Sequence, residues 1–131
     1  MENLIELGTV NCDLSEREVV ALYKRATALV FPSLIGPTNI PPLEAMVLGT
    51  SVLCSDLFSM PEQVGHAGLL FDPFDVEDMA EKIYRIWTDE NIRKELVKRG
   101  YDRIKNLTLE NYTMQWEEVI KGALQNKILD Q

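Results

Sequence analysis

Short apolar segments recur along the first 74 residues and predict strands at 4–7, 29–31, 51–54 and 68–71. None of them alternates cleanly between apolar and polar residues, and such runs are typical of strands covered on both faces, as in parallel sheets. Segments with helical spacing separate most of them. We therefore expect an α/β fold with a parallel sheet of about four strands, flanked by helices and joined by right-handed crossovers.

Helix boundaries are marked between these segments. Ser15 and Glu18 have the spacing of a capping box, in which the serine hydroxyl accepts from the Glu18 amide while the glutamate reaches back. Apolar residues at helical spacing follow, so the pattern predicts a helix over about 16–27. A short helix is expected over 41–49, where two prolines open it and a glycine closes it, and another short turn is expected from Pro61.

The chain is helical by its pattern from Asp75 to the end. Asp75, Asp89 and Thr108 each precede an apolar periodic segment and can cap a helix. We interpret residues 1–131 as a single domain with alternating strands and helices over 1–74 and an all-helical tail over 75–131. The aromatic residues at helical spacing in the tail are expected to be core anchors rather than ligand contacts: Trp87, Tyr112 and Trp116.

Composition and charge narrow the function classes. The 131 residues are 46% hydrophobic, enough for one globular core, and no apolar run approaches the length of a membrane span. Cys12 and Cys54 fit neither a disulfide framework nor a zinc pattern, so a soluble, cytoplasmic setting without a bound metal is expected. The net charge of −8 disfavours nucleic acid as a partner, and residues 1–80 carry three basic against twelve acidic side chains.

Candidate chemistry lies in residues 31–46, which link a predicted buried strand to a helix N-terminus. In an open parallel sheet ligands bind outside the carboxyl ends of the strands, and a helix N-terminus there suits phosphate. Gly36 lets a ligand approach the backbone, and the Glu44 carboxylate can bind a pair of sugar hydroxyls. The alternative is an ordinary loop in which Asn39 is the N-cap and Glu44 serves the helix dipole. The spacing alone leaves both interpretations open.

The same stretch resembles the donor-binding region of family 4 glycosyltransferases, and the match continues in order over nearly the whole chain. The matching segments are Leu7–Val10, Ala26–Ala28, Phe31–Ser33, Pro41–Met46, Gly49–Thr50, Ser55–Asp56, Met60–Gly65 and Ala67–Pro73. The resemblance implies the GT-B fold, in which two Rossmann-like domains enclose the active site. It further implies that a hexosyl group passes with retention, and without a metal, from a nucleotide sugar to an acceptor such as a glycan or a lipid-linked sugar.

By this resemblance the chain is the later part of the C-terminal, donor-binding domain. The acceptor domain and the first strands of the donor domain are missing, so residues 1–131 are expected to form an incomplete domain. The family motif has two glutamates, and Glu44 matches the second, which contacts the nucleotide ribose. The first position falls on Gly36, which has no carboxylate, and the catalytic residue is left unassigned.

The resemblance implies the remaining donor contacts. The loop is expected to hold the sugar and diphosphate through its backbone N–H groups and the side chains of Thr38 or Asn39, and the base is placed near Val10 and Asn11. The full set of expected donor-binding residues is Gly36, Pro37, Thr38, Asn39, Ile40 and Glu44.

Charge sets a limit on this function. A departing nucleoside diphosphate needs cationic stabilisation, and no Lys or Arg lies near the loop in the sequence. In the family, an Arg and a Lys from the missing segment supply it. We therefore expect the chain alone to bind donor weakly and to be inactive without an acceptor domain or a complementing chain.

A different class of function stays open. The chain can be a non-catalytic module that self-associates or pairs through a sheet edge left exposed by the missing strands. Contact with a membrane surface also stays open. A sugar-nucleotide epimerase of the GT-B fold is a weaker alternative, because the segment Pro41–Met46 resembles glycosyltransferases.

Overall fold

The computed structural model describes residues 13–36 and 38–129, in which helices and strands alternate before a helical tail. The first half holds α1 (Glu16–Arg25), β1 (Leu29–Phe31), α2 (Pro41–Val47), β2 (Val52–Ser55), α3 (Met60–Val64), the 3₁₀ turn η1 (Gly65–Ala67) and β3 (Gly68–Phe71). The tail holds α4 (Val76–Thr88), α5 (Glu90–Ile104) and α6 (Leu109–Leu129).

The strands form a parallel sheet in the order β1-β2-β3, with Phe31 opposite Cys54 and Cys54 opposite Leu70. This confirms the expected α/β class with a helix-flanked parallel sheet. Three of the expected strands are in it, and the fourth, at 4–7, lies outside the described residues. All carboxyl ends of the strands meet at one edge because the strands are parallel.

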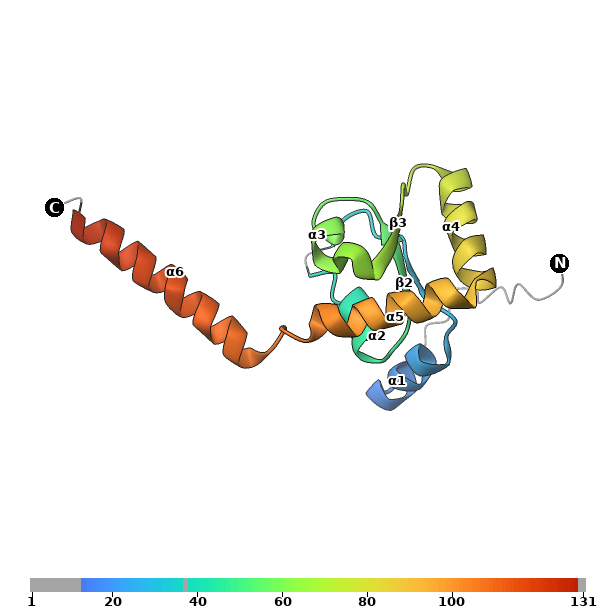
Figure 1. The fold of residues 1–131 in the computed structure, drawn as a ribbon, viewed down its shortest axis with the longest axis horizontal. Helices are drawn as coiled ribbons and strands as arrows, with labels where there is room; N and C mark the ends of the chain where they lie inside the picture. The colour runs from blue at the N-terminus through green and yellow to red at the C-terminus, as the bar shows by residue number, and fades with distance from the viewer. Residues whose placement is uncertain (1–12, 37, 130–131) are drawn as a thin grey trace.

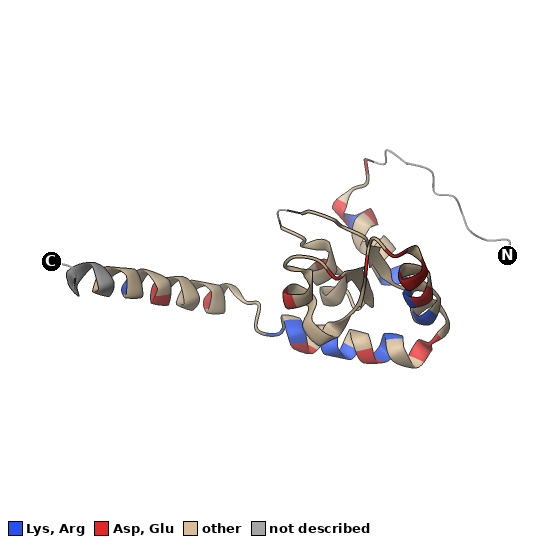
Figure 2. Cartoon of the chain, turned by 90° about the horizontal axis from the view of Figure 1, so that it is seen from above, with Lys and Arg blue, Asp and Glu red and all other residues tan. Residues whose placement is uncertain are grey.

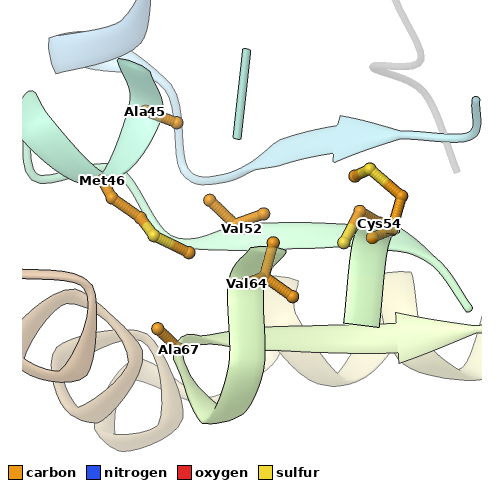
Figure 3. Packing of buried hydrophobic residues seen from close by; sticks show 7 residues of the cluster. Ala45, Met46, Val52, Cys54, Val64 and Ala67 are labelled. Atoms are coloured by element: carbon orange, nitrogen blue, oxygen red, sulfur yellow. The ribbon is translucent and has the colours of Figure 1, made fainter. Parts of the chain in front are cut away.

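The core lies on both faces of β2, whose residues are all buried. Val52 and Cys54 pack on one face with Met46 and Val64, which come from α2 and α3 (Figure 3). On the other face, Leu53 packs with residues of β3, α4 and α5, namely Phe71, Ile86 and Leu96. The alternation of side chains along a strand thus divides the core into two clusters, one on each side of the sheet.

Local signals in the sequence explain where α1, α4, α5 and α6 begin. The Glu18 carboxylate accepts from the Ser15 amide at 2.8 Å and from its hydroxyl at 2.6 Å, so the glutamate reaches back as expected. Asp75 and Asp89 each accept from two amides in the first turn of α4 and α5. Thr108 accepts from an amide of α6 at 3.2 Å.

The expectation that the tail aromatics are core anchors is wrong for the described structure. Trp87 is 66% exposed although its neighbour Ile86 is 2% exposed, because successive helical residues point about 100° apart and only one faces the sheet. Tyr112 and Trp116 are also exposed, edge-on to each other at 6.3 Å between ring centres. They stand on α6, which projects away from the sheet (Figure 1).

None of the described helices combines the length and the apolar character that crossing a membrane would need.

Candidate functional site

The loop of residues 32–40 leaves the carboxyl end of β1 and leads into α2, where the sequence places the donor site. Two buried or half-buried side chains brace it. Ser55, at the carboxyl end of β2, donates its hydroxyl to the carbonyl of Ser33. Gln63 of α3 donates its amide to the carbonyl of Thr38 at 3.3 Å, and Arg103 of α5 in turn holds the Gln63 carbonyl at 3.1 Å. The loop is therefore fixed from the sheet and from α3.

Asn39 does not cap α2, so that alternative interpretation is wrong. The N-cap is Ile40, and Asn39 lies in the left-handed region with φ of 47° and 7% of its surface exposed. The sequence holds the physical reason. If Asn39 were the N-cap, the second and third helical residues would be Pro41 and Pro42, neither of which has an N–H for the Asn39 side chain to accept.

The Asn39 side chain instead occupies the space beside Gly36. A Cβ added to Gly36 would overlap Asn39 Oδ1, and it would lie 2.9 Å from Asn39 Cγ and 3.3 Å from Ser33 Oγ. Gly36 is outside the left-handed region, so its requirement for glycine is steric rather than conformational. A larger residue at position 36 is incompatible with this placement of Asn39, whose buried Oδ1 has no hydrogen-bond donor among the described residues.

The N-terminus of α2 offers few free amides. Pro41 and Pro42 have no N–H, and the Leu43 amide already donates to the Ile40 carbonyl at 2.8 Å. Donors for a phosphate therefore come mainly from the loop itself, at Gly36, Thr38, Asn39 and Ile40, which lie within the described part of the chain. Pro37 lies outside the described residues and carries no N–H. Val10 and Asn11, the expected base contacts, also lie outside the described residues.

Glu44 stands in the first turn of α2 and faces α1. Tyr23 of α1 donates its hydroxyl to Glu44 Oε2 at 3.3 Å. Desolvation, followed by the nearby Glu44 charge and this hydrogen bond, raises the pKa of Tyr23 above its ordinary value of 10.0. The Tyr23 backbone carbonyl accepts from the Thr50 hydroxyl at 2.6 Å, which ties α1 to the start of β2.

A mostly apolar groove of about 460 Å³ runs between α1 and α2, beside this pair of side chains. It is lined by Leu14, Glu16, Val19, Val20, Tyr23, Glu44, Val47 and Leu48. The groove gives Glu44 an apolar neighbourhood on one side, while the rest of its side chain is exposed.

Among the described residues, the hydrogen bonds of Arg93, Arg99 and Arg103 go to groups outside the loop. Lys and Arg concentrate on α5, as Figure 2 shows. Arg93 donates to the carbonyls of Ile86 and Trp87, Arg99 to that of His66, and Arg103 to those of Glu62 and Gln63, so these side chains bind helix ends.

Within the part of the chain that the structure describes, no three His, Cys, Asp or Glu side chains come together to hold a metal ion.

Sequence reasoning missed four residues at this edge. By its spacing Tyr23 is only part of an apolar helix face, and Ser55 and Gln63 are only parts of the family motif. A serine that ends an otherwise apolar strand nevertheless indicates a hydrogen bond to the backbone. Phe58, after β2, has φ of 52° and is 76% exposed, an unusual combination for a bulky residue. No local sequence signal predicts it.

Known proteins resemble this chain over most of its length. The sequence profile of "Glycosyl transferases group 1" matches residues 10–103. O-antigen chain mannosyltransferase B of Escherichia coli is 37% identical over 100 residues, which cover 76% of this chain and 26% of that protein. Serotype-specific mannosyltransferase WbdA of Escherichia coli is 33% identical over 108 residues, which cover 76% of this chain and 13% of that protein.

A solved structure shows the same arrangement. Sucrose-phosphate synthase from Thermosynechococcus elongatus superposes with a TM-score of 0.68 at 29% identity, over 83% of this chain and 28% of that one. This similarity confirms the expected fold, a helix-flanked parallel sheet of the GT-B type. The chain spans about a quarter or less of the length of the two mannosyltransferases.

Proposed function

Because the chain belongs to the glycosyl transferases group 1 family, we propose that it is the donor-binding part of a retaining glycosyltransferase. The enzyme transfers a hexosyl group from a nucleotide sugar to an acceptor such as a glycan or a lipid-linked sugar. Two relatives are named mannosyltransferases, so a mannosyl nucleotide is the first donor to test. The acceptor is bound by parts of the enzyme outside this chain.

The placement of Glu44 carries this proposal. Its carboxylate lies at the start of α2, next to the loop at the carboxyl edge of the sheet, with one oxygen bonded to Tyr23 and the side chain otherwise exposed. A carboxylate with free lone pairs accepts from two neighbouring hydroxyls, as a ribose presents them. The groove between α1 and α2 suits the flat, apolar face of a nucleobase, near which Val10 and Asn11 are proposed to lie.

The diphosphate is proposed to bind the amides of Gly36 and Thr38–Ile40. A nucleoside diphosphate carries about two negative charges, whereas a helix N-terminus supplies about half a positive charge. Since the arginines of α5 bind carbonyls elsewhere, the chain by itself should bind donor weakly and should not catalyse transfer. Cationic residues from the rest of the enzyme complete the site.

A titration tests this assignment. We expect GDP-mannose or UDP-glucose, added to the ¹⁵N-labelled chain at millimolar concentration, to shift the amide signals of residues 36, 38–40 and 44 first. Shifts confined to α5 or α6 would contradict the assignment. The affinity should fall in Glu44→Gln, which removes the charge and keeps the shape.

Glu62 provides a matched control for that variant. It also lies in the first turn of a short helix with a proline near its start, Pro61, and it is exposed. Glu62→Gln changes the net charge by the same amount, so it should leave nucleotide affinity within error. Equal losses in the two variants would mean that Glu44 acts only through the overall charge of the chain.

A second candidate function is self-association or pairing with a complementary chain. β1 pairs with β2 on one side, and no described strand lies on its other side, while α6 exposes apolar side chains to solvent. Sedimentation at several concentrations tests it, because a pairing edge predicts a mass that rises with concentration. A single monomeric mass throughout would exclude this candidate.

A further inference from the structure

Glu44 has a long, exposed side chain, and the hydrogen bond from Tyr23 restrains it. The bond, 3.3 Å between the hydroxyl oxygen and Glu44 Oε2, joins residues 21 positions apart in the sequence. It is the one hydrogen bond to the Glu44 carboxylate among the described residues. Without it, the rotatable bonds of the glutamate would be restricted only by the helix.

Tyr23 itself is well anchored. Its ring packs against the core cluster that contains Met46 and Val52. Its backbone carbonyl accepts from Thr50, at the start of β2, so the residue is tied to the sheet as well as to α1. The hydroxyl is therefore presented from a fixed ring toward the exposed Glu44 carboxylate.

Resting on the proposed function of Glu44 as the ribose ligand, we infer that Tyr23 is its positioning residue and thereby sets a preference for ribonucleotides over deoxyribonucleotides. Tyr23 holds Oε2 by donating to it, so Oε1 and the remaining lone pairs of Oε2 face outward for the 2′- and 3′-hydroxyls. The phenol and the ribose hydroxyls all donate to the carboxylate, whose two oxygens offer about four acceptor sites, so one bond from Tyr23 leaves sites for both hydroxyls. The tyrosine therefore restrains the carboxylate without occupying the lone pairs that the ribose needs.

Tyr23→Phe tests the inference because it removes the hydroxyl and keeps the packed ring. Affinity is measured by titration with GDP and with 2′,3′-dideoxy-GDP, which lacks both hydroxyls. We expect Tyr23→Phe to weaken GDP binding by about 3- to 10-fold, the cost of ordering one free side chain, and to leave dideoxy-GDP binding unchanged. In a Glu44→Gln background the same change should have a much smaller effect on GDP.

Tyr101→Phe is the matched control. That hydroxyl lies against Gly49, and among the described residues only Tyr23 bonds the Glu44 carboxylate, so the loss of the Tyr101 hydroxyl should leave both affinities unchanged. A Tyr23→Phe variant that weakens GDP and dideoxy-GDP equally would show that Tyr23 acts only on the fold and would overturn the inference. No effect on either ligand would overturn it as well.

A measurement on the unaltered chain covers the case in which Tyr23→Phe fails to fold. With tyrosine labelled at the ¹³Cζ carbon, GDP should shift the Tyr23 signal and dideoxy-GDP should not. Shifts of equal size with both ligands would overturn the inference. If GDP binds but Glu44→Gln leaves its affinity unchanged, the proposed function of Glu44 fails and the inference fails with it, whereas intact Glu44 dependence without a Tyr23 effect rejects the inference alone.

Discussion

Two buried serines at the ends of β2 allow the loop of the proposed donor site to be tested against a matched control. Ser51 precedes the strand and donates its hydroxyl to the Thr27 carbonyl at 2.9 Å. Ser55 ends the strand and donates to the Ser33 carbonyl, within the loop that leads to α2. Both residues are at most 2% exposed. They differ mainly in position, because Ser51 bonds the backbone at the amino edge of the sheet and Ser55 bonds it at the carboxyl edge.

Replacing either serine with alanine leaves a carbonyl without its donor. The free energy of unfolding should fall by about 1–3 kcal/mol in each variant. With a urea m-value of about 1–2 kcal/mol per molar, the midpoint of unfolding should drop by about 1 M. Only Ser55→Ala releases the loop, so it alone should weaken nucleotide binding, by about 3- to 10-fold if ordering the loop costs about 1 kcal/mol on binding.

Urea unfolding followed by circular dichroism measures the first effect, and a GDP-mannose titration measures the second. The amide signals of Ser33 to Ile40 should move in Ser55→Ala and stay in place in Ser51→Ala. If both variants lose the same stability and both bind nucleotide as the unaltered chain does, the brace from Ser55 has no role in the site. Equal losses of binding in both would refute the reasoning too, since they would report only a weakened sheet.

Two further predictions concern the steric overlap beside Gly36 and the burial of the Cys54 thiol. Gly36→Ala should lower the free energy of unfolding by about 1–3 kcal/mol, because the new methyl overlaps the Asn39 amide. Gly122→Ala should not destabilise the chain, since nothing lies within 4 Å of a Cβ at that position. Thermal unfolding distinguishes the two variants. Burial raises the pKa of the Cys54 thiol from 9.0 to about 12. In a Cys12→Ser background, iodoacetamide at pH 8 should therefore alkylate the folded chain about 1,000-fold more slowly than the urea-unfolded one, and comparable rates would contradict the burial.

The parts of the fold that were predictable are those with local causes. Asp75 and Asp89 cap their helices because a carboxylate reaches amides two and three residues ahead, a contact that the sequence alone specifies. α1 ends at Arg25, two residues before the predicted end at 27, because Ala26 turns to extended backbone with ψ of 143°. The three strands within the described residues lie within one residue of their predicted bounds, because their runs are short, apolar and closed by turns.

The candidate site was predictable only in outline, because its contacts join distant segments. Glu44 stood out by its neighbours in the sequence, but its partner Tyr23 is a full strand away and looks like any apolar helix residue. The spacing left Asn39 open between a helix cap and a donor contact, although the prolines after it exclude the cap, as a count of the available N–H groups shows. The spacing of apolar residues could not predict the exposure of Trp116, because a helical pattern predicts an apolar face and not which element covers it.

The first 80 residues carry three basic and twelve acidic side chains, and this imbalance bears on how the loop can bind a diphosphate. The Asn39 side chain leaves no room for a side chain at position 36, so the loop holds an uncharged amide where a carboxylate would add to the repulsion of a diphosphate. Yet removing a negative charge does not supply a positive one, and the arginines of α5 are bound to carbonyls at helix ends. Under the proposed function, Glu44 and the loop amides orient the nucleotide, and the cations that stabilise the leaving diphosphate come from another part of the enzyme.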